Sequence, residues 1–104
     1  LLEGADGAVF VADSQQERVD ANLESLRSLR DNLTSHGINF ETIPYALQLN
    51  KRDLPNVLPV DELKKELLVK NEPVFEAVAS KGTGVFETLK GVAKLVLQEL
   101  TKTG

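Results

Sequence analysis

The chain has 104 residues, a length that suits one domain, and 41% of them are hydrophobic, which is typical of a globular protein. Its net charge of -4, with no cluster of basic residues, argues against nucleic acid as a partner. With no cysteine and a single histidine, the composition excludes disulfides, thiolate metal sites and histidine-based metal sites. No apolar run reaches the roughly 20 residues of a membrane span. No secretory signal is recognisable, so we expect a cytoplasmic protein.

The first predicted element is a strand over residues 8–12, an apolar and partly β-branched run that we expect to be buried on both faces. Ser14 and Glu17 have the spacing of a capping box, which predicts that a helix begins there. Asp13 could be a site residue at a strand end, but the preferred interpretation is that it ends the strand or caps this helix. The helix carries one apolar stripe, formed by Val19, Leu23, Leu26, Leu29 and Leu33.

Two further strand–helix units follow along the chain. Residues 43–49 predict a second strand, a loop punctuated by Pro55 and Pro59 comes next, and the apolar residues of 60–67 fit a short helix. Residues 73–79 predict a third strand, 81–84 a glycine-containing turn, and 85–100 a long helix with a strong apolar stripe.

This β-α-β-α-β-α alternation predicts an α/β fold, because helical crossovers between strands imply a parallel sheet with right-handed connections. No linker divides residues 1–104, so we expect one domain. Three strands are few for such a sheet, and an apolar first strand without a neighbour is an aggregation hazard. We therefore expect the chain to be the rear part of a larger α/β domain.

The first motif is Asn50-Lys51-Arg52-Asp53, which follows the second predicted strand. Open α/β sheets bind ligands at the carboxyl ends of their strands. The Asp53 carboxylate would accept hydrogen bonds from the N1–H and the 2-amino group of guanine, whereas adenine has an acceptor at N1 and no 2-amino group. Asn50 would bind the base edge and brace loops, and the Lys51 stem would lie over the purine. The alternative is an ordinary polar turn after a strand.

The second motif is Glu76-Ala77-Val78-Ala79-Ser80-Lys81-Gly82-Thr83-Gly84-Val85, which runs from the end of the third predicted strand through the turn after it. Small residues allow a backbone N–H to approach a ligand carbonyl closely, and here that carbonyl would be guanine O6. Taken alone, the segment is better interpreted as a plain strand-to-helix turn. Its combination with the upstream Asn-Lys-x-Asp motif favours a guanine site.

The order and spacing of these segments resemble the C-terminal half of a small Ras-like GTPase, which has a three-layer, P-loop-GTPase-like parallel sheet. The resemblance covers nearly the whole chain and is greatest to the bacterial gliding-motility and cell-polarity GTPases. It rests on "GADGAVFVADSQQERVDANLESLRSLRDNL", "LNKRDLPNVLPVDEL" and "EAVASKGTGVFETLK". It implies that Asn50 and Asp53 recognise the base and that Lys51 stacks on it. It also implies that the Ala79 N–H faces O6. Val78 and Ser80 stand where many relatives have Ser and Lys, so either Ser80 or Lys81 would cover the base.

The resemblance implies GTP or GDP as the ligand, and Mg²⁺ only through the N-terminal half of the same G domain. No G-x-x-x-x-G-K-[ST] motif is present in the 104 residues, and phosphoryl transfer depends on that loop and on the switch regions. We therefore expect the chain alone to be non-catalytic. A roadblock-type GTPase-activating protein is a further partner that the resemblance implies.

A second hypothesis remains open at this point. The chain could be a non-enzymatic interaction module that forms a homodimer by pairing the strand at residues 8–12 with a second copy. The two hypotheses differ in whether guanine nucleotide binds and in whether oligomers form without it.

Overall fold

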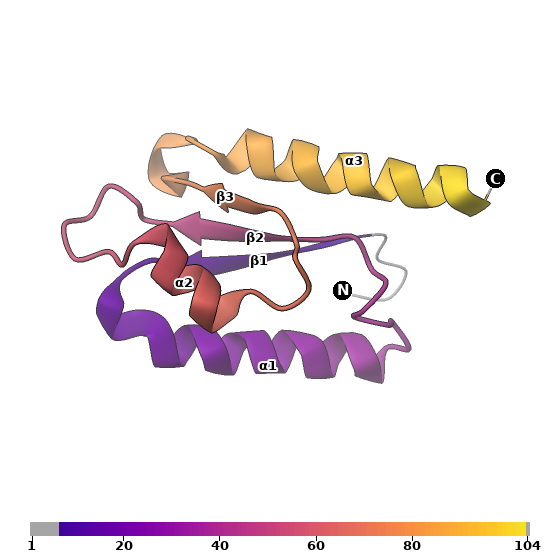
Figure 1. Ribbon diagram of the computed structural model, residues 1–104, viewed down its shortest axis with the longest axis horizontal. Helices are drawn as coiled ribbons and strands as arrows, with labels where there is room; N and C mark the ends of the chain where they lie inside the picture. Colours follow the sequence, from indigo (N-terminus) through magenta and orange to yellow (C-terminus); the bar gives the residue numbers. More distant parts are fainter. Residues whose placement is uncertain (1–6, 104) are drawn as a thin grey trace.

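The computed structural model describes residues 7–103, which form an α/β fold with a three-stranded sheet between helices (Figure 1). Helices α1 and α3 lie on opposite sides of the sheet, and α2 packs beside α1. The elements in chain order are β1 (Ala8–Asp13), η1 (a 3-10 turn, Gln16–Arg18), α1 (Val19–Ser35), β2 (Tyr45–Asn50), α2 (Val60–Leu67), β3 (Val74–Glu76), η2 (a 3-10 turn, Ala79–Lys81) and α3 (Val85–Thr103).

The sheet has the order β1-β2-β3, and both pairs of neighbours are parallel. This confirms the predicted α/β class and parallel sheet, an arrangement consistent with part of a P-loop-GTPase-like fold. The register pairs Asp13 with Asn50 and Leu49 with Glu76. The carboxyl ends of all three strands therefore meet at one edge of the sheet (Figure 1).

The main core lies between the sheet and the layer of α1 and α2. Leu26 and Leu33 of α1 pack there with Leu63 and Leu67 of α2 and with the central strand β2. Burying one leucine side chain contributes about 1.5–3 kcal/mol, so the stripe predicted on α1 anchors that helix to the sheet.

The expectation that the first strand is buried on both faces is wrong. Phe10 and Ala12 are buried, but Val11, which points to the other face, is 52% exposed. The reason is the position of β1 in the sheet: among the described residues it pairs with β2 on one side only. Of the three strands within residues 7–103, the central strand β2 is the one that is buried on both faces.

The predicted capping box at Ser14 and Glu17 does not form. Helix α1 begins at Val19 after the 3-10 turn, and neither helical segment has a side-chain N-cap hydrogen bond. The Ser14 hydroxyl is buried without a hydrogen-bond partner among the described residues. Asp13 instead accepts a hydrogen bond from the Gln15 N–H, a local turn that competes with direct entry into a helix.

The third strand is shorter than the predicted 73–79. It ends at Glu76 because its partner β2 ends at Asn50, after which Lys51 turns away with a φ of 63°. The Ala77 N–H still bonds to the Leu49 carbonyl at 2.8 Å, and the next donor, the Arg52 N–H, already belongs to the loop. The strand end is thus set by its neighbour, which single-strand patterning does not reveal.

Helix α3 leaves part of its apolar surface uncovered. Phe86 is 70% exposed and Leu97 is 62% exposed, and both lie on one stripe of the helix. This exposed α3 stripe consists of Phe86, Leu89, Leu97 and Leu100.

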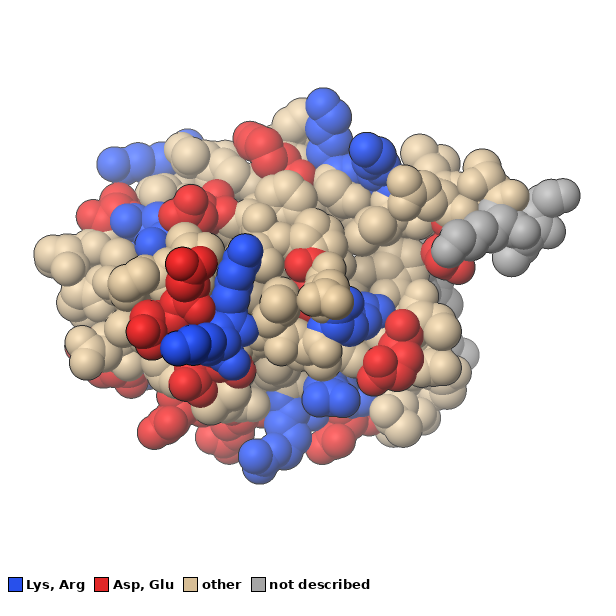
Figure 2. All heavy atoms as spheres, viewed as in Figure 1, with Lys and Arg blue, Asp and Glu red and all other residues tan. Residues whose placement is uncertain are grey.

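The charged side chains are mixed rather than segregated. Figure 2 shows lysine and arginine interspersed with aspartate and glutamate on the face that it displays, with no continuous basic surface there. Within residues 7–103, no helix is long and apolar enough to cross a membrane.

Candidate functional site

The candidate site is a hollow of about 230 Å³ at the carboxyl edge of the sheet. The loop after β2 forms one side and the segment after β3 forms the other. All six residues predicted from the two motifs lie around this one hollow, together with a residue that was not predicted, Leu54. The lining residues are Asn50, Lys51, Asp53, Leu54, Val78, Ala79 and Ser80.

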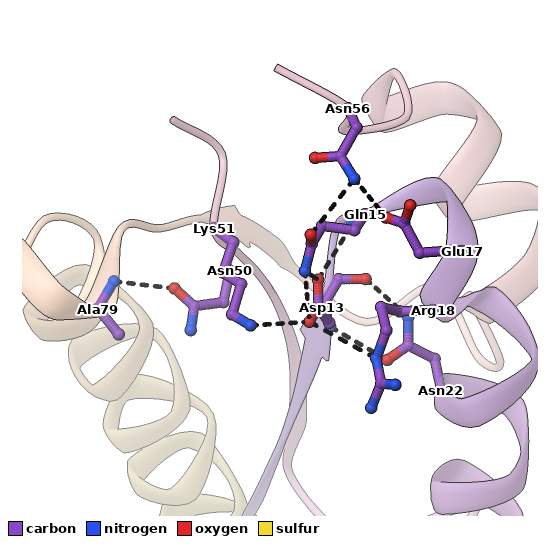
Figure 3. A network of polar contacts seen from close by, with 9 residues as sticks. All are labelled: Asp13, Gln15, Glu17, Arg18, Asn22, Asn50, Lys51, Asn56 and Ala79. Carbon is purple, nitrogen blue, oxygen red and sulfur yellow. Dashed lines mark hydrogen bonds and ion pairs between the residues drawn. The ribbon is translucent and has the colours of Figure 1, made fainter. Parts of the chain in front are cut away.

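A hydrogen bond joins the two motifs across the hollow. The Ala79 N–H donates to the Asn50 Oδ1 at 2.8 Å (Figure 3). Asn50 is the last residue of β2, and the Ala79 amide begins the 3-10 turn after β3. The resemblance implies that the Ala79 N–H donates to guanine O6. In this structure the same N–H donates to the side-chain oxygen of Asn50.

Asp53 lines the hollow, and its carboxylate is partly exposed. Its side chain is 37% exposed, and Lys81 Nζ stands 3.9 Å from Oδ2. An exposed pair at that distance contributes little stability, so a ligand donor can displace it at low cost. Lys81 follows Ser80 in the same 3-10 turn, so this turn brings a positive charge as well as Ala79 to the site.

Lys51 forms an ion pair with Asp13, the residue interpreted from the sequence as a strand end or a helix cap. Its Nζ donates to Asp13 Oδ2 at 3.0 Å, although the two residues are 38 positions apart (Figure 3). Lys51 also has a left-handed backbone, with a φ of 63°. A non-glycine residue in this region costs of order 1–3 kcal/mol, so the surrounding contacts must maintain this conformation.

Asp13 itself is fixed by several partners. The Gln15 N–H and Nε2 both donate to its carboxylate at 3.0 Å, and Arg18 Nε stands 3.8 Å away. The buried side chain of Asn22 in α1 accepts from the Asp13 N–H at 3.1 Å and donates to the Asp13 carbonyl at 2.8 Å. Strand β1 and helix α1 together therefore set the position of this carboxylate.

The charge state of Asp13 follows from these contacts. Partial burial raises the pKa of the carboxyl, but the hydrogen bonds from Gln15 and Lys51 and the positive charge of Lys51 lower it. The lowering contributions together are larger, so the pKa lies below the ordinary value of 3.8. Asp13 is an anion at neutral pH.

Arg52, to which no role was assigned from the sequence, braces both sides of the site. Its Nε donates to Glu76 Oε1 at 3.1 Å and its Nη1 donates to the Leu58 carbonyl at 2.6 Å. Its backbone N–H donates to the Ala77 carbonyl at 3.2 Å. It therefore connects the loop that carries Asp53 to the end of β3.

The segment after β3 is shaped by a close backbone approach. A Cβ on Gly84 would lie 2.1 Å from the Glu76 carbonyl oxygen, and the residue has a φ of 78°. Below it, the buried Gln48 Nε2 donates to Thr88 Oγ1 at 2.8 Å, and that hydroxyl donates to the Gly84 carbonyl at 2.7 Å. The central strand thus fixes the start of α3 and, with it, the loop that presents Ala79.

The strand-end position of Asp13 was a signal for a place beside the site, although the preferred interpretation was a strand end or a helix cap. Asp13 and Asn50 each close a predicted strand, and the ends of parallel strands meet at one edge. The pairing of Lys81 with Asp53 was not predicted, because it depends on the 3-10 turn that carries Lys81. In the part of the chain that the structure describes, no group of three or more acidic or histidine side chains is placed to hold a metal ion.

Comparison with known proteins gives one informative match. No family model matches the sequence. The chain is 58% identical over all 104 residues to the mutual gliding-motility protein MglA of Myxococcus xanthus (strain DK1622). It spans about half of that relative, 53% of its length. The resemblance inferred from the sequence is thereby confirmed: this chain is similar to MglA along its whole length.

Proposed function

We propose that the chain supplies the base-recognition half of a guanine-nucleotide switch of the MglA kind. The observation that carries the proposal is the Asn50–Ala79 hydrogen bond, which joins the two motifs around one hollow that Asp53 also lines. The similarity to MglA supports the same assignment.

The chemistry of the hollow fits guanine in two places. Asp53 offers a carboxylate to the N1–H and the 2-amino group, and two charge-assisted bonds of about 1.5–3 kcal/mol each amount to roughly 10²–10⁴ in affinity. The Ala79 N–H suits the O6 oxygen, which would take the place of the Asn50 oxygen. Asn50 would then turn its amide to the base edge, while Val78 and Ser80 complete the wall.

We further propose that the N-terminal half of the same G domain covers the surfaces that these residues leave open. Strand β1 is paired on one side only, with Val11 exposed, and the exposed α3 stripe lies in the layer that also packs on β1. A strand beside β1 with a helix against α3 would cover both surfaces. Phosphate binding, Mg²⁺ binding and GTP hydrolysis would belong to that half.

The same surfaces favour the alternative of a homodimeric interaction module, since a second copy could cover an open edge and an apolar stripe. Sedimentation of the protein at micromolar concentration, with and without GDP, separates the two. A monomer in both samples supports the single-G-domain proposal, whereas a nucleotide-independent dimer supports the module.

The name of the relative concerns gliding motility, so we propose a role as a motility or polarity switch, with a roadblock-type GTPase-activating protein as a partner. A strain that carries Asp53→Asn at the native locus tests this role. We expect altered gliding or polarity at normal protein levels, and unchanged behaviour would contradict it.

Competition binding tests the nucleotide proposal with the protein made from its complete coding sequence. We expect GDP to bind at least about 10²-fold more tightly than ADP, and IDP, which lacks the 2-amino group, to bind about 10- to 100-fold more weakly than GDP. A matched control is Asp61→Asn, which removes an exposed carboxylate on α2 away from the hollow. Equal affinities for GDP and ADP would contradict the proposal.

A further inference from the structure

We propose that Asp13 is a positioning residue for base recognition, which acts by holding the ammonium group of Lys51 at the end of β1. This inference rests on the guanine-binding function proposed above. Asp13 lies outside the hollow and does not line it, so its effect would pass through Lys51.

Lys51 is held both at its backbone and at its side-chain ammonium group. Its backbone leaves β2 in the left-handed region, while its Nζ is 3.0 Å from Asp13 Oδ2 on the neighbouring strand. The side chain therefore spans the ends of two strands, and it remains 49% exposed along its length. A stem fixed in this way presents methylene groups to a flat ligand without first losing its rotamer freedom.

The Asp13 carboxylate, which serves as the anchor for the Lys51 ammonium group, is held more rigidly than the carboxylate of an ordinary surface ion pair. The Asp13 side chain is only 18% exposed, compared with 49% for Lys51. The carboxylate is bound by Gln15 from its own turn, and its backbone is clamped on both sides by the buried Asn22. Asp13 is thus ordered before Lys51 binds it, which reduces the entropy that the pair must overcome.

The charge of Asp13 distinguishes this role from that of a helix cap. An asparagine at position 13 keeps an oxygen that accepts the Gln15 N–H, so the local turn persists. It loses the negative charge that attracts Lys51. Asp13→Asn is therefore a conservative variant that removes the anchor and leaves the turn.

A double-mutant cycle tests the inference. GDP and IDP affinities are measured for the wild type, Asp13→Asn, Lys51→Met and the double variant. Arg18→Gln serves as the control, because Arg18 is the other cation near Asp13 and stands farther away, at 3.8 Å. The protein is again made from its complete coding sequence.

We expect Asp13→Asn to weaken GDP binding about five- to tenfold. The double variant should match Lys51→Met within about twofold, since the anchor has no effect without its lysine. The GDP-to-IDP ratio should stay unchanged, because Lys51 contacts the purine face rather than the 2-amino group. Arg18→Gln should bind GDP within about twofold of the wild type.

Three results would overturn the inference. Effects of the two substitutions that multiply in the double variant would show that Asp13 does not act through Lys51. A lowered GDP-to-IDP ratio in Asp13→Asn would indicate a general loosening of the hollow. Equal binding of GDP and ADP by the wild type would contradict the proposed function, and this inference would fail with it. Because that result comes from the wild type alone, it is distinguished from a failure of the inference, which only the variants show.

Discussion

Replacing Gly84 by alanine tests whether the backbone approach after β3 shapes the site. The added Cβ would lie 2.1 Å from the Glu76 carbonyl oxygen and 2.9 Å from the Ala77 Cα, and backbone atoms cannot yield as a flexible side chain would. The residue also has a φ of 78°, where alanine is disfavoured.

The magnitude follows from three contributions to the free energy of unfolding. Alanine in the left-handed region costs about 1–2 kcal/mol, and its restriction of the unfolded chain returns about 0.4–1 kcal/mol. Overpacking against fixed backbone adds about 1–3 kcal/mol. We therefore expect Gly84→Ala to destabilise the protein by about 1–5 kcal/mol.

Gly82 offers a matched control two residues earlier in the same loop. It has a φ of 77°, but a Cβ there would meet nothing within 4 Å. Urea denaturation should therefore show a loss of about 1 kcal/mol or less for Gly82→Ala. Gly84→Ala should in addition weaken GDP binding, because the loop that presents Ala79 must shift. Equal losses of stability in the two variants would refute the reasoning.

Three other expectations follow from named contacts. Thr88→Val leaves the buried Gln48 amide without its partner and should lower the free energy of unfolding by about 1–3 kcal/mol, which urea denaturation measures. The folded pKa of Asp13 lies below 3.8, so its contribution to stability is present above pH 3.8 and is lost as the pH falls through the folded pKa. The difference in unfolding free energy between wild type and Asp13→Asn should therefore shrink as the pH is lowered below 3.8, which acid denaturation measures. Leu97→Lys should destabilise the protein by roughly 2 kcal/mol or more if other polypeptide covers the exposed α3 stripe, whereas a change within about 0.5 kcal/mol in thermal unfolding would contradict that coverage.

The sequence was sufficient to predict the order and type of the main elements. The alternation of apolar runs and helical stripes gave the parallel α/β sheet, and the stripe on α1 is the one that packs. The errors arose where a neighbour overrides local pattern. Strand β3 ends early because β2 ends, and β1 is half exposed because of its edge position. The predicted Ser14 capping box does not form because the Asp13 carboxylate accepts the Gln15 N–H and favours a local turn instead.

For the candidate site too, the sequence predicted some features, while others depend on tertiary structure. The spacing of Asn50, Lys51 and Asp53, together with the small residues after β3, predicted which side chains gather at one hollow. The sequence did not indicate that Asp13 would hold Lys51 or that Arg52 would brace the loop, because both contacts depend on the register between strands. The Asn50–Ala79 bond also depends on tertiary structure, since it joins residues 29 positions apart.

The central claim is that the Asp53 carboxylate reads the 2-amino and N1–H groups of guanine. Its most direct test compares the affinities of wild type and Asp53→Asn for GDP and for XDP, whose base carries an oxygen in place of the 2-amino group. The asparagine places an amide donor opposite that oxygen, so the account predicts GDP preference in the wild type and XDP preference in the variant. An unchanged preference for GDP in Asp53→Asn would contradict the account.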